Sequence, residues 1–185
     1  MKKALAIALF AAVAAAAGCA SSERRAARQA NPAPCPNVVV LADAGRVIEF
    51  DGEPALENVA YSGEIVNVHL DCRYFLARPI EASLRIELTF GKGPKAAQDT
   101  HQYKYFVAVT RTNMEVIEKV EIPVSVRFGS NESVRTVRER IEQITIPRAD
   151  ENTSGTNFEV IVGLVLTPQQ AIYNRSSHSL KFPEL

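Results

Sequence analysis

A histidine and an aspartate lie two positions apart in a stretch that alternates between apolar and polar residues. His69 and Asp71 share its polar face, and an imidazole beside a carboxylate can form a weak acid/base pair or supply two metal ligands. His101 and His178 lie on other segments, without the short spacing of a zinc site. The sequence contains no nucleophile elbow, phosphate loop, dinucleotide fingerprint, HExxH or CxxC motif. We therefore predict no catalytic residue, metal or cofactor, and interpret His69 and Asp71 as a solvent-facing pair.

The start of the chain predicts export. Lys2 and Lys3 precede 15 uncharged residues, at positions 4–18. A run of this length is an export signal and is shorter than a membrane span of about 20 residues. We therefore expect residues 1–18 to be removed as a signal peptide.

The sequence Ala16, Ala17, Gly18, Cys19 resembles the lipobox of bacterial lipoproteins. The resemblance implies that Cys19 is acylated, with chains such as palmitate, and becomes the new N-terminus. Each buried CH₂ contributes about 0.8 kcal/mol, so several acyl chains give a stable membrane anchor. Ala20, in place of Asp, implies transfer to the periplasmic face of the outer membrane. The small residues at 14–20 also offer sites for ordinary signal peptidase, which is the alternative route.

Two cysteines remain once Cys19 is acylated, and an exported compartment oxidises accessible pairs. We predict a disulfide between Cys35 and Cys72, closing a loop of about 38 residues that is worth about 4 kcal/mol in the chain-entropy model. The alternative is two buried free thiols. Intact mass before and after reduction and alkylation distinguishes them.

The chain after the signal peptide divides into a tether and one domain. Residues 19–34 carry no apolar side chain larger than alanine after Cys19, but include Arg24, Arg25 and Arg28. A linker of this length reaches at most about 50 Å, and its arginines either contact anionic headgroups or cell-wall polymer or are simply solvated. Residues 35–185 suit one domain. Lys2 and Lys3 are among the 21 basic residues, which leaves 19 against 21 acidic ones and indicates no nucleic-acid partner.

Alternation with period two dominates from Cys35 onward and predicts antiparallel strands with one face on a core. Residues 80–90 are the clearest case, and four further stretches repeat the pattern. Turn residues separate them. We predict an all-β, antiparallel, immunoglobulin-like sandwich of seven to eight strands. The predicted core faces are Ile80, Ala82, Leu84, Ile86, Leu88 and Phe90; Val66, Val68, Leu70, Cys72 and Tyr74; Tyr103, Tyr105, Val107 and Val109; Val116, Val120, Ile122, Val124, Val126 and Phe128; and Phe158, Val160, Val162, Leu164 and Leu166.

Three segments need separate interpretation. Pro123 cannot donate to a strand ladder, which places residues 116–128 at an edge or a bulge. Val134 to Ile146 fits both a helix and a strand, and we predict a strand that ends at Pro147. Thr167 followed by Pro168 is typical of a helix start, so we expect a short helical turn over 167–174, followed by a loose or docked tail over 175–185.

Two surface features could contact a partner. Lys92 and Lys95 lie on a Gly-Pro loop, and functional contacts concentrate on loops held by a rigid scaffold. They form either a contact loop or a solvated turn. Tyr103 and Tyr105 share a strand face, where they either fill the core or stack against sugars, and we favour the core.

Several stretches of the domain resemble uncharacterised small outer-membrane lipoproteins of Gram-negative bacteria: residues 35–46, 72–74, 105–109, 163–168 and 173–175. The resemblance covers nearly the whole chain after the signal peptide. It implies a self-contained envelope domain whose signature includes both Cys35 and Cys72. It supplies no activity and no catalytic residue.

These observations favour a lipid-anchored binding or scaffolding module of the outer membrane. Its partner would be another envelope component, engaged through loops and the exposed edge at 116–128. The alternative is a carrier of a small apolar or glycan ligand held between the two sheets. A hydrolase using His69 and Asp71 is the least favoured hypothesis.

Overall fold

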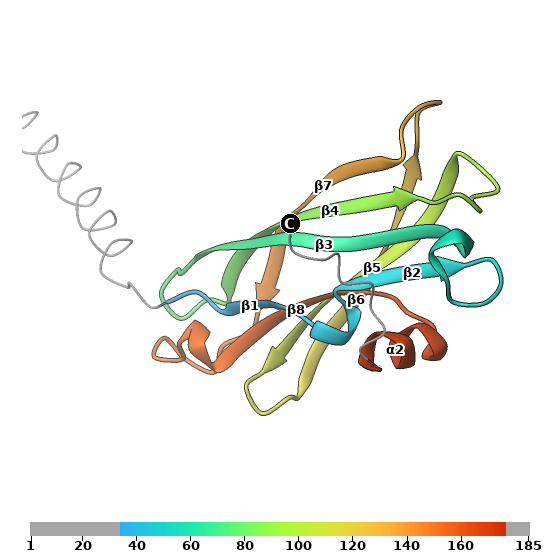
Figure 1. The fold of residues 1–185 in the computed structure, drawn as a ribbon. Coiled ribbons are helices and arrows are strands. Elements are labelled where there is room, and N and C mark those ends of the chain that lie inside the picture. Colours follow the sequence, from blue (N-terminus) through green and yellow to red (C-terminus); the bar gives the residue numbers. More distant parts are fainter. Residues whose placement is uncertain (1–33, 177–185) are drawn as a thin grey trace, which may run out of the picture.

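The computed structural model describes residues 34–176, which form two four-stranded sheets packed face to face (Figure 1). The predicted signal peptide, Cys19, the predicted tether up to residue 33 and residues 177–185 lie outside the described residues. The predicted all-β sandwich is confirmed, with eight strands in the described range. One sheet has the order β1 (Asn37–Val40), β8 (Phe158–Leu164), β5 (Thr100–Arg111), β6 (Val116–Arg127), and the other β2 (Arg46–Phe50), β3 (Val59–Arg73), β4 (Ile80–Lys92), β7 (Val134–Ile146).

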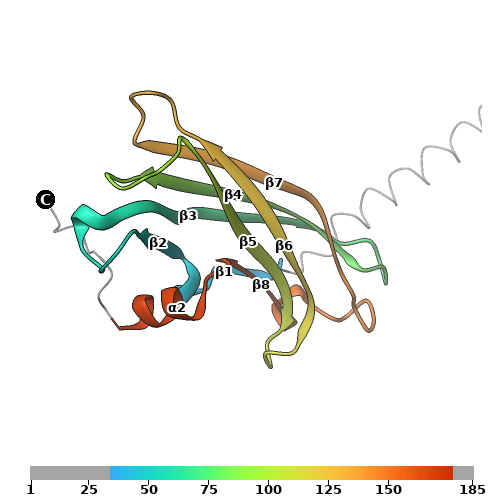
Figure 2. The same cartoon turned by 90° about the vertical axis from the view of Figure 1, so that its right-hand side faces the viewer.

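Antiparallel pairing dominates, with one exception. β1 runs parallel to β8, with Asn37 opposite Glu159 and Val40 opposite Val162. After β1 the chain passes through a short 3₁₀ turn, η1 (Ala42–Ala44), and enters the opposite sheet as β2. The two sheets cross at a wide angle, so that β5 and β6 run steeply against β3, β4 and β7 (Figure 2).

The core follows the predicted alternation most closely in β4. Its even-numbered residues from Ile80 to Phe90 are all buried, and Ile80, Leu84, Leu88 and Phe90 have no exposed surface. Across the interior, β8 contributes four further side chains that are fully or almost fully buried: Phe158, Val160, Val162 and Leu164. Each such side chain stabilises the fold by about 1.5–3 kcal/mol relative to exposure. β4 and β8 therefore form the centre of the sandwich.

The prediction that Val66 lies on the core face of β3 is wrong, because its side chain is 57% exposed. Ile65 pairs with Leu88 and Asn67 pairs with Glu87, so Val66 is an extra residue with no partner in β4. A bulge of this kind shifts the alternation by one position. Ile65 consequently takes the core position, whereas Val68, Leu70 and Cys72 still pack against the core.

The ambiguous segment Val134–Ile146 is a strand, as predicted. Ala82 pairs with Ile144 and Leu84 with Ile141, so that two residues of β7 lie opposite Ser83 alone. This bulge places Ile141 and Ile144, three positions apart, against the same core. The helix-like spacing of the sequence is therefore the spacing of a bulged strand.

The predicted disulfide between Cys35 and Cys72 is present, with the two Cα atoms 5.6 Å apart. Cys35 lies two residues before β1, and Cys72 lies near the end of β3. The neighbouring Tyr74 hydroxyl donates to the carbonyl of Pro34 (2.7 Å) and accepts from the N–H of Gly155 (2.8 Å). The beginning of the domain is thus held to β3 by a covalent bond and by hydrogen bonds.

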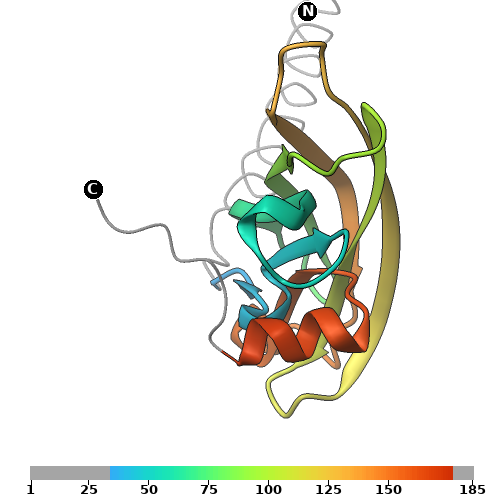
Figure 3. The same ribbon diagram turned by 45° about the vertical axis from the view of Figure 1, so that its right-hand side comes forward.

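The chain closes with the helix α2 (Pro168–Arg175), as Thr167 and Pro168 predicted. Thr167 accepts from the N–H of Gln170, and the Gln170 side chain accepts from the N–H of Thr167. Asn174 donates to the carbonyls of Asp43 and Arg46, and Arg175 pairs with Asp43. In Figure 3, α2 lies at the opposite end of the view from the β6–β7 connection. No helix within residues 34–176 is long and apolar enough to cross a membrane.

Replacing Thr167 with alanine is expected to lower the free energy of unfolding by about 1 kcal/mol, because the N–H of Gln170 loses its cap. Urea denaturation of the two proteins measures the difference. Gln169→Ala, next to the cap in the same exposed turn, is the control and should change stability by less than about 0.5 kcal/mol. Equal losses in both variants would contradict the role assigned to the cap.

Candidate binding groove between two sheet edges

Two long strands form free edges of the sandwich, one in each sheet. β6 is the last strand of its sheet beyond β5, and β7 is the last strand of the other beyond β4. The edge position predicted from Pro123 is therefore confirmed for β6. Both strands carry features that discourage unwanted pairing: Pro123 and Lys119 on β6, and several arginines and a bulge on β7.

The inner face of β6 is only partly covered by the opposite sheet. Val124 and Val126 are buried, but Ile122 is half-buried and Val120 is 48% exposed, although it pairs with the buried Val107 and shares its face. The prediction that this whole face is buried is thus wrong at Val120, and also at Val116, which is exposed beside a bulge. The opposite sheet therefore does not close over this part of β6, and β7 lines the opening from the other side.

A groove of 270 Å³ lies in this opening. Its walls are six aliphatic side chains, four of them from the two edge strands and two from β5. Glu118, Gln143 and Thr145 supply polar groups. The aliphatic residues are Val107 and Val109 on β5, Val120 and Ile122 on β6, and Ile141 and Ile144 on β7. Such a surface can take an apolar chain or alternate side chains of an extended peptide, and its polar atoms can orient either one.

The tyrosines beside the groove are core residues. Tyr103 packs against Phe90, with ring centroids 4.2 Å apart, and donates to the carbonyl of Ser62 (3.1 Å). Burial raises the pKa of Tyr103, and the Glu49 carboxylate raises it further. Burial, followed by the charge of Glu139 on β7, raises the pKa of Tyr105 to about 12. The core interpretation of both tyrosines is therefore confirmed over sugar stacking.

These tyrosines predict a loss of stability at alkaline pH. An unfolded tyrosine ionises near pH 10, whereas folded Tyr105 keeps its proton to about pH 12. The stabilisation is fully present below pH 10 and is lost as the pH rises toward 12, because the unfolded state then binds fewer protons. Denaturation at stepped pH should show this fall, with a smaller fall in Tyr105→Phe. Equal pH dependence in both proteins would count against it.

The structure brings His69 and Asp71 together, on the outer face of the β2-β3-β4-β7 sheet. His69 Nε2 lies 3.2 Å from Asp71 Oδ1, and Arg85 lies 3.0 Å from the other carboxylate oxygen. Both members of the pair are more than half exposed. Water competes for every one of these contacts, so the pair suits a solvated charged surface.

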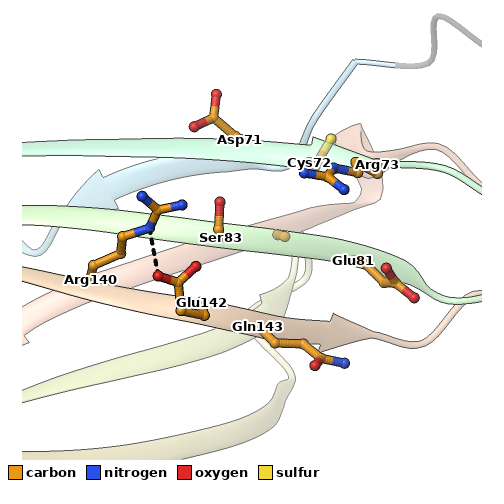
Figure 4. A pocket seen from close by; sticks show the side chains of 9 residues that line it. Asp71, Cys72, Arg73, Glu81, Ser83, Arg140, Glu142 and Gln143 are labelled. Carbon is orange, nitrogen blue, oxygen red and sulfur yellow. Dashed lines mark ion pairs between the residues drawn. The ribbon is translucent and has the colours of Figure 1, made fainter.

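A polar hollow of 430 Å³ crosses the same face over β3, β4 and β7 (Figure 4). Its charged side chains alternate in sign, and Arg140 pairs with Glu142 at 3.0 Å. Three carboxylates face two guanidinium groups, so the charges nearly cancel and give little basis for selecting a charged ligand. The charged side chains are Asp71, Arg73, Glu81, Arg140 and Glu142. We therefore do not assign a ligand to it.

The predicted contact loop is packed against the fold. Lys92 pairs with Asp99 at 2.8 Å, and this bond holds the pKa of Asp99 below its usual value. Gly93 donates to the carbonyl of Ala60 and Lys95 donates its backbone N–H to Val59, which continues the pairing with β3. A Cβ on Gly93 would lie 2.2 Å from the Val59 oxygen. Lys95 is exposed, whereas Lys92 is paired with Asp99. A contact role for the two lysines together stays a prediction.

Two sequence predictions concern metal binding and lipidation. Within the described range, no group of three His, Cys, Asp or Glu residues is placed to hold a metal ion. The lipidation site, Cys19, lies outside that range.

Sequence reasoning missed the groove, although a signal was present. Glu118 falls between Val116 and Val120 on the predicted apolar face of β6. Glu139 similarly falls between Val137 and Ile141 on β7, opposite the buried Ile86. A carboxylate at a core position requires access to water. Together these glutamates indicated two edge strands with partly open inner faces.

No family model matches this chain, and no curated protein matches it. A glycosyl hydrolase family 2 member from Bacteroides cellulosilyticus is similar over 55% of this chain and 15% of its own, at 11% identity and a TM-score of 0.31. The variable domain of the AgI/II polypeptide BspA from Streptococcus agalactiae is similar over 65% of this chain and 73% of its own, at 11% identity and a TM-score of 0.20. The chain thus spans only a small part of the hydrolase.

Proposed function

We propose that this protein is a lipid-anchored binding module on the periplasmic face of the bacterial outer membrane, where it engages another envelope protein through the β6–β7 groove. The residues Ala16 to Cys19 support the anchor, because they resemble a lipobox. The opening between the edge strands supports binding. Its exposed inner face, with Val120 at the centre, is the observation that carries the proposal.

The mode of binding follows from the two edges. A free edge offers unpaired backbone N–H and C=O groups, which an extended segment of a partner can complete. Alternate side chains of the added strand would then point into the groove between β6 and β7. Main-chain hydrogen bonds supply affinity, and the aliphatic walls favour small or medium apolar residues at every second position.

Crosslinking in intact cells tests the proposal. A reversible crosslinker, followed by purification of the lipidated protein from envelope fractions, should yield a specific set of envelope proteins. A matched purification of Val120→Asp should lose them. A clean monomer from cells expressing the native chain would contradict the proposal.

A carrier of a small apolar ligand is the second candidate. It is favoured by the aliphatic composition of the groove walls, which also suits an acyl chain. Native mass spectrometry of protein purified without detergent exchange distinguishes the two functions. A copurified mass that is lost in Val120→Asp would support the carrier, whereas protein of bare mass with crosslinked partners would support the binding module.

A further inference from the structure

Two loop tips carry exposed apolar side chains in an unusual backbone conformation. Leu76 and Met114 are 70% and 72% exposed, the most exposed large hydrophobic residues in the described part of the chain. They are also the two non-glycine residues of that part with positive φ, at 48° and 72°. Glycine or asparagine usually occupies such positions in soluble turns. A leucine and a methionine there hold apolar groups out into the surroundings at a conformational cost.

The two tips belong to one end of the sandwich. Arg148 donates to the carbonyls of Leu76, Arg78 and Glu151, which ties the β3–β4 loop to the chain that follows β7. That chain leads to η3 (Gly155–Asn157), where the Asn157 carbonyl accepts from the N–H of Thr112 in the β5–β6 turn (3.1 Å). Figures 1 and 2 show the β3–β4 loop beside the connection from β7 to β8.

The tether leaves the domain at the same end. Pro34 is the first described residue, and its carbonyl accepts from Tyr74, two positions before Leu76. A lipid on Cys19 would be at most about 50 Å from Pro34 along an extended tether. The end that carries Leu76 and Met114 is therefore the end most readily brought to the bilayer.

The charges around the tips are balanced. Arg78 pairs with Glu81 at 3.5 Å, and Arg111 pairs with Glu115 at 3.2 Å. Arg73 lies opposite Glu81 across the strands, and Arg148 is followed by Asp150 and Glu151. This composition gives no strong field for an anionic ligand. Arginine side chains can, however, extend along an apolar surface and keep their charge at the headgroup level.

We infer that this end of the sandwich rests on the outer-membrane bilayer, with Leu76 and Met114 as shallow apolar anchors in the interfacial region. The inference rests on the proposed lipid anchor. Two side chains alone bury little area, so they would orient a protein that the lipid already holds, and would not recruit it from solution. In this orientation the three loops face lipid, and the strand edges are presented to other envelope proteins.

Tryptophan fluorescence tests the inference, because the chain contains no tryptophan. Leu76→Trp places a single probe at one tip. Leu56→Trp, at an exposed position in η2 (Leu56–Asn58) at the other end of β3, is the matched control. Both full-length mature proteins are reconstituted into phospholipid vesicles and excited where tyrosine does not absorb. Circular dichroism verifies that each variant keeps its β spectrum.

The Leu76→Trp emission should shift to shorter wavelength on reconstitution, and lipids brominated on the acyl chains should quench it several-fold more than that of Leu56→Trp. Flotation of the vesicles reports separately on the anchor. Protein that floats with position 76 still in water overturns the inference and leaves the anchor intact. Protein that does not float contradicts the lipid anchor, and the inference falls with it, because two side chains do not hold the protein at the bilayer on their own. Protein that does not float and whose emission does not shift contradicts both the anchor and the inference. Met114→Trp repeats the test if Leu76→Trp does not fold.

Discussion

A chain with serine at both Cys35 and Cys72 is expected to unfold with a free energy about 4 kcal/mol below that of the native protein. The disulfide joins positions 37 residues apart, and its loss returns loop entropy to the unfolded state. The native state is weakened as well, because β1 has only four residues and one strand partner, β8. Without the bridge, the segment before β1 is held to the end of β3 chiefly by the hydrogen bond from Tyr74 to Pro34.

Guanidinium denaturation followed by circular dichroism measures this loss. The matched control is the native protein in excess reductant, which should be destabilised, whereas the double serine variant should be indifferent to reductant. If the double variant does not fold, the reduced native protein still gives the loss of stability that follows from breaking the disulfide. Native protein that is equally stable with and without reductant, after complete thiol labelling has verified reduction, would contradict the prediction.

Val120→Asp is expected to abolish partner capture while leaving the fold intact. The side chain lies on the inner face of the β6 edge and lines the groove. An aspartate there would put a carboxylate against any apolar side chain or acyl group bound between β6 and β7, and would add to the negative charge of Glu118. We expect at least a tenfold loss of affinity, which corresponds to about 1.4 kcal/mol. Because Val120 is half exposed, the stability loss should be about 1 kcal/mol.

Val134→Asp is the matched control, since it introduces the same change at an exposed valine on the other edge strand, outside the groove lining. Both variants lose a β-branched residue and gain one negative charge, so they should be similarly stable. Binding by crosslinked copurification should be lost in Val120→Asp alone. Equal binding by the two variants would exclude the groove as the contact surface.

The parts of the fold that could be predicted are those in which local pattern and tertiary packing agree. In β4, each residue from Ile80 to Phe90 has the side predicted by alternation, because sheet neighbours flank it and the opposite sheet covers it. The disulfide was predicted from the expected export and the number of cysteines, and α2 was predicted from the Thr167–Pro168 pair. These features depend on few distant contacts.

The remaining features depend on how the sheets meet. A bulge at Val66 moves one residue out of phase, and only pairing with β4 determines where that happens. The parallel alignment of β1 with β8 joins strands at opposite ends of the chain, so no local pattern indicates its direction. The groove lies where the opposite sheet does not close over β6. In the sequence, Glu118 and Glu139 at core positions are the signal of this groove. Cys19 predicts where the protein is located but does not predict its partner.

Site-specific photocrosslinking at position 120 tests the central claim most directly. A photoreactive amino acid replaces Val120 in the lipidated protein, and a second strain carries it at Val134. Irradiation of intact cells should produce a discrete adduct with an envelope protein from position 120 and none from position 134. An adduct pattern that is the same from both positions, or no adduct from position 120 in protein shown to be folded and membrane-bound, would contradict a binding groove between β6 and β7.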